Sequence, residues 1–156
     1  MEPYFKPITV DMIYVSPLKA KLVEKDGWEK VLPVDKTVPP TGSIIMDAVA
    51  DILKHTTISS VKGLAAQLKV KPKELSGAIH ILTRQNAVDF IIDYRIKQAK
   101  ELLACTNLDM KEIAKRCGLK WAENLAQRFQ KEEKMSPRDY RAKHRPEDYV
   151  RRYEWE

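Results

Sequence analysis

The chain has 156 residues, of which 44% are hydrophobic and 32% are charged, so it is long enough for one hydrophobic core with an appendage. It contains no run of 18 apolar residues, and its N-terminus lacks a charged segment followed by an apolar one. We therefore expect a globular, cytoplasmic protein without a membrane span, whose formal charge of +6 permits a polyanionic partner.

The positive charge lies wholly after Gly42. Residues 1–42 carry six lysines and six acidic residues, whereas residues 43–105 and 106–156 each carry an excess of three cations. A nucleic-acid partner is therefore expected to contact the chain after Gly42. The neutral first segment is a poor candidate for a basic arm that grips DNA.

Residues 1–42 are predicted to form an N-terminal arm, because Pro39-Pro40-Thr41-Gly42 continues neither a helix nor a strand. Two local structures compete within this arm. Asp26-Gly27 is a turn signal for a β-hairpin, whereas Ser16-Pro17 and Gly27 would frame a short helix. The hairpin is the favoured alternative. The arm holds too many apolar residues for a solvated tail, so we expect it to pack on the domain, on a second copy or on another protein.

After Gly42 the apolar residues recur at helical spacing. Ile45 to Ile52 fit one helix, and a second begins near Ser59 or Ser60 as its N-cap. Pro72 fits the first turn of a third helix.

The second half of the chain predicts further helices. Residues 87–104 carry one apolar stripe and form a single long helix. Asp109 and Glu112 are a capping pair at the start of the next helix, and Ser136-Pro137 opens another. Residues 149–153 are spaced for a last short amphipathic helix.

Two segments of the chain align with each other at an offset of 49 to 50 residues. Val61, Lys62, Leu64, Ala65, Leu68 and Val70 align with Met110, Lys111, Ile113, Ala114, Cys117 and Leu119, and Leu75 and Ile79 align with Leu125 and Phe129. A short helix, a tight turn and a second helix are thus used twice, as in a helix-turn-helix. Gly118 suits a turn residue with positive φ, whereas Lys69 at the equivalent position predicts mild strain.

Four stretches carry a family signal: Asn86-Ala87-Val88-Asp89-Phe90-Ile91; Tyr94-Arg95-Ile96-Lys97-Gln98-Ala99-Lys100-Glu101-Leu102-Leu103; Lys111-Glu112-Ile113-Ala114 with Cys117-Gly118-Leu119; and Met135-Ser136-Pro137-Arg138-Asp139-Tyr140-Arg141. With them, Leu64 to Arg141 resembles the DNA-binding domain of the AraC/XylS transcriptional regulators. The resemblance implies a mainly α fold with two helix-turn-helix subdomains joined by a long linker helix. We place the arm at 1–42 and the AraC-type DNA-binding domain at 43–156, with helix-turn-helix units at 59–84 and 109–133, the linker helix at 87–104 and C-terminal helices at 136–156.

The resemblance also implies that the second helix of each unit enters a major groove of DNA. An 18-residue linker helix spans roughly 27 Å, which with its flanking turns approaches the ~34 Å repeat of DNA, so one monomer would read two successive grooves. Relatives usually carry a ligand-binding domain of well over a hundred residues, on the order of a full domain. The short arm cannot form such a pocket, so no small-molecule effector and no cofactor are expected.

The candidate DNA contacts follow position by position from the resemblance. The base-reading candidates are Lys73, Ser76, His80, Glu123, Asn124 and Gln127, and the phosphate candidates are Lys71, Lys120, Arg128 and Lys131. Asn124 and Gln127 carry amides suited to adenine, and Glu123 can accept from cytosine N4. Each candidate also fits an ordinary solvated side chain. Many relatives carry arginine at the positions of Gly77 and Gln127, so we expect few direct contacts between this chain and the bases.

Two function classes remain in competition. The first is a sequence-specific transcription regulator whose partner is double-stranded DNA, and the second is a protein-interaction module with degenerate base recognition. An enzyme is not expected, because no phosphate-binding loop, catalytic carboxylate pair or activated nucleophile is present. Cys105 and Cys117 lack the spacing of a metal site or a disulfide framework, so they are interpreted as reduced structural residues. Arg95 interrupts an apolar stripe and is predicted to tie helices together.

Overall fold

The structure is a computed structural model that describes residues 6–119 and 122–155, with the side chains of 122–125 outside the description. The described chain is mainly helical with a small antiparallel sheet, as the sequence predicts. It divides into two compact units. The first unit comprises the residues up to Val15 with Thr37–Arg95, and the second comprises Ser16–Lys36 with Ile96–Glu156. No helix within the described ranges is long and apolar enough to cross a membrane.

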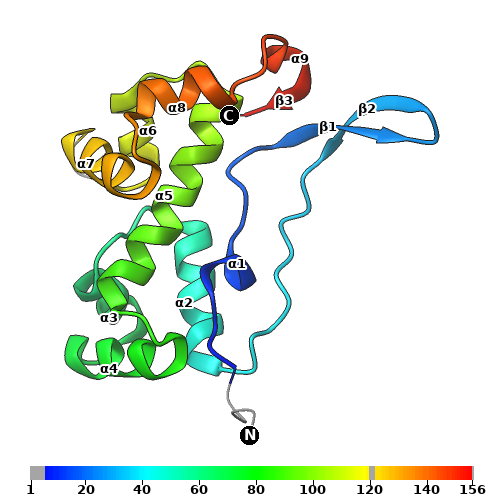
Figure 1. The fold of residues 1–156 in the computed structure, drawn as a ribbon. Coiled ribbons are helices and arrows are strands. Elements are labelled where there is room, and N and C mark those ends of the chain that lie inside the picture. The colour runs from blue at the N-terminus through cyan, green and yellow to red at the C-terminus, as the bar shows by residue number, and fades with distance from the viewer. Residues whose placement is uncertain (1–5, 120–121, 156) are drawn as a thin grey trace, which may run out of the picture. The chain divides into compact units, whose positions relative to one another are not determined.

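The first unit is a helical bundle (Figure 1). Its elements are α1 Val10–Ile13, α2 Ile44–His55, α3 Val61–Leu68, α4 Pro72–Thr83 and the first half of α5 Ala87–Cys105. Local sequence sets the starts of these helices. The Ser60 hydroxyl caps α3, and Pro72 occupies the first turn of α4, as predicted.

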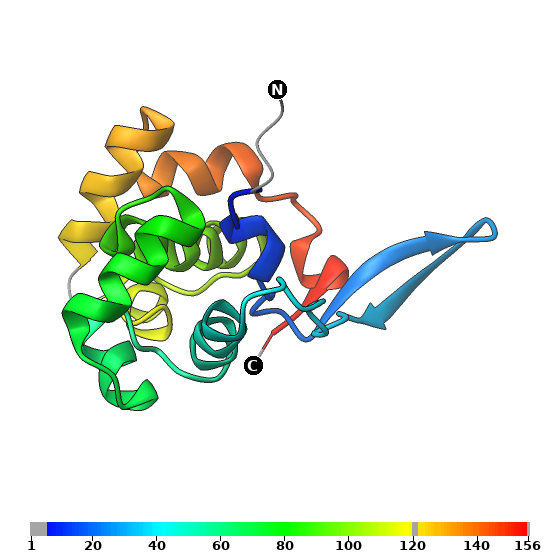
Figure 2. The same ribbon diagram turned by 90° about the horizontal axis from the view of Figure 1, so that it is seen from below.

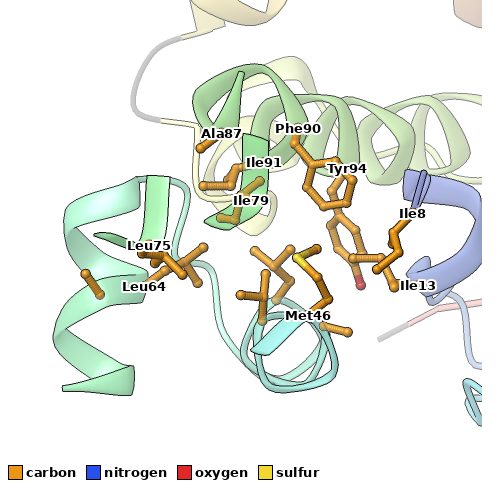
Figure 3. Packing of buried hydrophobic residues seen from close by; sticks show 14 residues of the cluster. Ile8, Ile13, Met46, Leu64, Leu75, Ile79, Ala87, Phe90, Ile91 and Tyr94 are labelled. Atoms are coloured by element: carbon orange, nitrogen blue, oxygen red, sulfur yellow. The ribbon is translucent and has the colours of Figure 1, made fainter. Parts of the chain in front are cut away.

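The core of the first unit collects one face from each helix (Figure 3). Met46 of α2, Leu64 of α3 and Ile79 of α4 are fully buried. Phe90 and Tyr94 of α5 close the cluster, because they lie one helical turn apart on the same face. Burial of this apolar surface is the main stabilising contribution to the unit.

The segment before α2 adds to this core rather than remaining a solvated tail. Ile8 and Ile13 are buried in the same cluster (Figure 3), and the Ile8 N–H donates to the Leu82 carbonyl at 2.9 Å. Residues 16–36, in contrast, belong to the second unit. The predicted arm is therefore shared between both units, and the domain boundary at Gly42 stays a prediction.

The second unit combines helices with a β-hairpin (Figures 1 and 2). Its elements are β1 Ala20–Lys25, β2 Trp28–Pro33, the second half of α5, α6 Met110–Arg116, α7 Ala122–Glu133, α8 Pro137–His144, α9 Tyr149–Arg152 and β3 Tyr153–Glu154. Asp26 and Gly27 both have positive φ, which matches the twist that a two-residue hairpin turn requires. The favoured hairpin is thus confirmed, and the alternative short helix is wrong.

The sheet has the strand order β2-β1-β3, with both pairs antiparallel. β3 pairs with the start of β1 through Ala20↔Glu154 and Lys21↔Tyr153. The last predicted helix therefore ends earlier than its apolar spacing indicates, because Tyr153 joins a strand. This pairing ties the hairpin to the C-terminal segment of the second unit.

Cys105 and Cys117 are both buried, which agrees with their interpretation as structural residues. Burial, together with the smaller effect of the Glu101 carboxylate, raises the pKa of the Cys105 thiol to about 11. A thiol with so high a pKa is a poor nucleophile near neutral pH. Across the described ranges, no group of three or more His, Cys, Asp and Glu side chains is placed to hold a metal ion.

Candidate nucleic-acid interface

Each unit contains a short helix followed by a second helix, and both short helices begin with the same type of cap. The Ser60 hydroxyl accepts from the Gly63 N–H at 3.0 Å at the start of α3. The Asp109 carboxylate accepts from the Glu112 N–H at 2.7 Å at the start of α6. The cap pairs one main-chain N–H that the helix leaves unbonded at its N-terminus.

The turns of the two units are also equivalent. Lys69 and Gly118 both adopt positive φ, at 57° and 69°. The next residue then donates back into the short helix: the Val70 N–H bonds Ala65 at 3.1 Å, and the Leu119 N–H bonds the Ala114 carbonyl at 2.8 Å. The strain predicted at Lys69 is confirmed, because a side chain in the left-handed region costs energy that glycine avoids.

The structural repeat extends upstream of the part that sequence comparison found. The Thr56 hydroxyl donates to the Ile52 carbonyl at 2.7 Å and accepts from the Ile58 N–H at 3.2 Å. Thr106 makes the same two bonds, to Leu102 at 2.6 Å and from Leu108 at 3.2 Å. Threonines 50 residues apart thus end α2 and α5 in the same way, an equivalence that lies outside the segments aligned by sequence.

Arg95 attaches α5 to the segment that leads into the first helix-turn-helix. The side chain is only 1% exposed. Its guanidinium donates to the carbonyls of Leu53 at 2.9 Å, Thr56 at 3.0 Å and Ile58 at 2.6 Å. Arg95 therefore ties helices together, as predicted, because its rigid fork of donors reaches several acceptors at once.

Arg141 has the corresponding role in the second unit, although its sequence context does not predict one. It donates to the carbonyls of Leu103, at 3.0 Å, and Leu108, and Arg145 reaches the Thr106 carbonyl at 3.4 Å. Partial burial lowers the pKa of Arg141 and nearby Arg145 lowers it further, but the carbonyl oxygens still receive a charged donor. We name the contacts of Arg95 and Arg141 with these main-chain oxygens the carbonyl clamps.

The second helix of the first unit, α4, presents its candidate residues on one face. Lys73, Ser76 and His80 follow the i, i+3, i+7 spacing, while Leu75 and Ile79 are buried on the core side. Lys73 and His80 are exposed and Ser76 is half-buried.

Lys71 and His80 differ in their surroundings. Lys71, the N-cap residue of α4, is exposed and makes no side-chain cap. The His80 Nδ1 lies 3.3 Å from the Gln85 carbonyl oxygen, so this ring has a local partner at the end of the helix.

The second helix of the second unit, α7, shows a similar separation of faces. Gln127 and Lys131 are exposed and lie one turn apart, while Phe129 is fully buried. Arg128 is paired within the helix, with its Nε 3.5 Å from a Glu132 carboxylate oxygen. The side chains of the candidates Glu123 and Asn124, and the whole of Lys120, lie outside the described residues.

The two helix-turn-helix segments differ in charge. Residues 59–84 contain five lysines and arginines and one acidic residue, whereas residues 109–133 contain six and five. The first segment therefore offers the stronger attraction to a polyanion.

This geometry is that of a helix-turn-helix DNA-binding domain present twice, and comparison with known proteins agrees. A family model for the helix-turn-helix domain of AraC-type regulators matches residues 64–143, more than half of the chain. The chain belongs to this AraC-type family of DNA-binding domains of transcription regulators. No curated protein matches the chain.

Several solved structures share the fold. The DNA-binding domain of the global transcriptional factor AdpA, solved in complex with a target DNA, is 28% identical with a TM-score of 0.58, covering 64% of this chain and 90% of that one. The C-terminal domain of the response regulator AraT from Geobacillus stearothermophilus is 30% identical with a TM-score of 0.61, covering 68% and 89%. For the C-terminal domain of yesN from Fusobacterium nucleatum subsp. nucleatum, 22% identity and a TM-score of 0.55, with coverages of 63% and 94%, show the fold alone.

Proposed function

We propose that the protein is a sequence-specific transcription regulator that inserts α4 and α7 into successive major grooves of double-stranded DNA. The observation that carries the proposal is the duplicated helix-turn-helix, with equivalent caps and turns in both units. Two equivalent reading helices on one chain suit two grooves without a dimer. The AdpA domain, whose structure contains a target DNA, supports this reading.

The proposed contacts divide by chemistry. Lys73, Ser76, His80, Glu123, Asn124 and Gln127 are the proposed base readers, and Lys71, Lys120, Arg128 and Lys131 are the proposed phosphate contacts. Lys73 and Gln127 are the base readers best supported by the structure, because both side chains are exposed and can reach a groove without any rearrangement. The Arg128–Glu132 pair must open before Arg128 can bind a phosphate.

Selection from a random pool of duplex DNA, followed by titration against salt, tests the proposal. Specific binding predicts a preferred site with at least about 10³-fold higher affinity than random DNA. The double variant Lys71→Gln/Lys131→Gln removes two exposed, proposed phosphate contacts and is expected to reduce the log-log salt slope by about 0.9 for each lost contact. The exposed Lys6, outside both helix-turn-helix segments, gives a matched control in Lys6→Gln, which should leave the slope unchanged.

A second function, as a protein-interaction module, is favoured by the absence of arginine at the exposed positions Gly77 and Gln127. The same experiment separates the two. If the selected pool shows no preferred sequence while non-specific affinity persists, base recognition is degenerate and the module function replaces the first proposal. If a site is found, Gln127→Ala should relax the preference at one or two of its base pairs.

A further inference from the structure

The β-hairpin is neutral in total but has two faces of opposite charge. Directly opposite residues of an antiparallel pair lie on the same face. The register places all three of its strand lysines on one side, which we name the basic face: Lys21, Val23, Lys25, Trp28, Lys30 and Leu32. The acidic face holds Ala20, Leu22, Glu24, Glu29, Val31 and Pro33.

The tip of the basic face is open to solvent. Trp28 is 72% exposed, and it lies opposite Lys25 and two residues from Lys30 on the same face. Lys21, nearer the base, is already paired with Glu101 at 3.0 Å. Neither Lys25 nor Lys30 forms an ion pair with any residue that the structure describes. The large apolar surface of a tryptophan is unfavourable in water, and the same surface contributes strongly to binding when a partner buries it.

The acidic face is partly neutralised within its own unit. Glu29 accepts from the Arg151 guanidinium of α9 at 2.8 Å. Among the described residues, no ion pair is formed by Glu24 on the acidic face or by Lys25 and Lys30 on the basic face. The larger unpaired charge is therefore that of the two lysines, and carboxylates of a partner would complement it.

A surface cavity in the first unit has the matching chemistry. It measures about 210 Å³ and is lined by Val38, Pro39, Pro40, Asp47, Ala50, Asp51 and Lys54. Four of the seven lining residues are apolar, and among the other three, two carboxylates outnumber one ammonium. One oxygen of Asp47 already accepts from the Thr41 N–H and hydroxyl at 2.8 Å. The Asp51 side chain is 73% exposed and lies 3.4 Å from the exposed His55 ring, a surface pair that a lysine of a partner can replace at little cost. The volume lies below the ~300–1,000 Å³ of small-molecule sites, so a single large side chain fits it better.

We propose that the hairpin of one copy inserts Trp28 into this cavity of a second copy. The indole would pack on Val38 and the prolines, and Lys25 or Lys30 would pair with Asp51. Reciprocal insertion gives a closed two-fold dimer in which both contacts form together. Neither contact uses a residue proposed to touch DNA, so the inference is independent of the proposed function.

A second copy is favoured over DNA as the occupant of the basic face. Within the second unit, the hairpin extends away from α7 in both views (Figures 1 and 2). An apolar side chain such as Trp28 is also buried better in a Val- and Pro-lined cavity than against a solvated phosphate backbone.

Sedimentation equilibrium of the whole chain without DNA tests the proposal. The weight-average mass is expected to rise with concentration from 18.0 kDa toward twice that value. Trp28→Ala should weaken the association at least tenfold. Ile81→Ala is the matched control, because Ile81 is 70% exposed on α4 and lies on neither surface. A wild-type chain that stays at the monomer mass up to about 1 mM overturns the proposal, since insertion within one chain leaves the mass unchanged.

Charge reversal distinguishes this contact from any other self-association. Lys25→Glu/Lys30→Glu and Asp51→Lys should each be monomeric alone, because like charges then meet. An equimolar mixture of the two variants should associate, because the reversed hairpin meets the reversed cavity and the two native surfaces also meet. Circular dichroism verifies that each variant is folded. Self-association that survives both single reversals, or a mixture that remains monomeric, overturns the assignment.

Discussion

Arg95 shows how a single buried side chain can organise a helical unit without touching a ligand. Its charge would be costly in an apolar core if it were unbonded. Three main-chain oxygens surround it instead, that of Leu53 in the last turn of α2 and those of Thr56 and Ile58 in the segment that follows. These oxygens have no N–H partner within the helix, so the guanidinium and the carbonyl groups supply the hydrogen bonds that each would otherwise lack.

We expect Arg95→Met to lower the free energy of unfolding by about 3–5 kcal/mol, because the replacement leaves buried carbonyl oxygens without donors. Urea unfolding followed by circular dichroism measures the change. Lys62→Met on the exposed side of α3 is the control and should change stability by less than about 0.5 kcal/mol. Equal unfolding midpoints for Arg95→Met and the wild type would show that water replaces the guanidinium at no cost.

The turn residues Lys69 and Gly118 predict opposite effects of glycine and alanine. Lys69→Gly should stabilise the protein by about 0.5–1 kcal/mol, because relief of left-handed strain exceeds the entropy gained by the unfolded chain. Gly118→Ala should destabilise it by a similar amount. Thermal unfolding of both variants checks the pair, and a loss of stability in Lys69→Gly would contradict the strain argument.

At this scale the sequence predicted Arg95 but not Arg141. Arg95 stands out because it breaks an apolar stripe, whereas Arg141 lies in a helix with many other cations. Only the positions of the carbonyls of Leu103 and Leu108 distinguish it from its neighbours.

The helices begin where short-range chemistry places them. Ser60, Asp109 and Ser136 each accept from an N–H three residues ahead, and each was visible as a cap in the sequence. The hairpin was visible for the same reason, because Asp26-Gly27 encodes its own turn. The strand at Tyr153 was not, since its partner Lys21 lies far away in sequence.

Removing a cap should therefore have a local and measurable cost. We expect Ser60→Ala to reduce stability by about 1 kcal/mol, because one N–H at the start of α3 loses its acceptor. Ser60→Asp should retain the bond and restore most of that stability. Urea unfolding of both variants provides the measurement. If Ser60→Asp proves as unstable as Ser60→Ala, the hydroxyl does not act as a cap.

The two units share one covalent element, α5, which starts in the first and ends in the second. Composition and periodicity predicted the bounds of this helix to within one residue, because a long apolar stripe at helical spacing is compatible with few other structures. The division of the N-terminal segment between the units was not predicted. Apolar content shows that a segment packs, but it carries no information about which surface receives it.

The shared helix offers a test of two-groove binding. One alanine inserted between Arg95 and Ile96 turns the following helix by about 100° relative to the preceding part. We expect both units to remain folded by circular dichroism while affinity for the selected DNA site falls at least tenfold. Insertion of seven residues, about two turns, nearly restores the rotational phase and separates rotation from length. Full affinity after the single insertion would mean that one unit alone reads the site.

The carbonyl clamps have an evolutionary consequence. Every amino acid carries a main-chain carbonyl, so substitution at Leu53, Ile58 or Leu108 leaves the acceptor of the clamp in place. The α4 side chains Lys73, Ser76 and His80 take no part in either clamp. Under the proposed function, new base preferences would therefore arise by substitution on α4 without disturbing the attachment of the helix-turn-helix to α5.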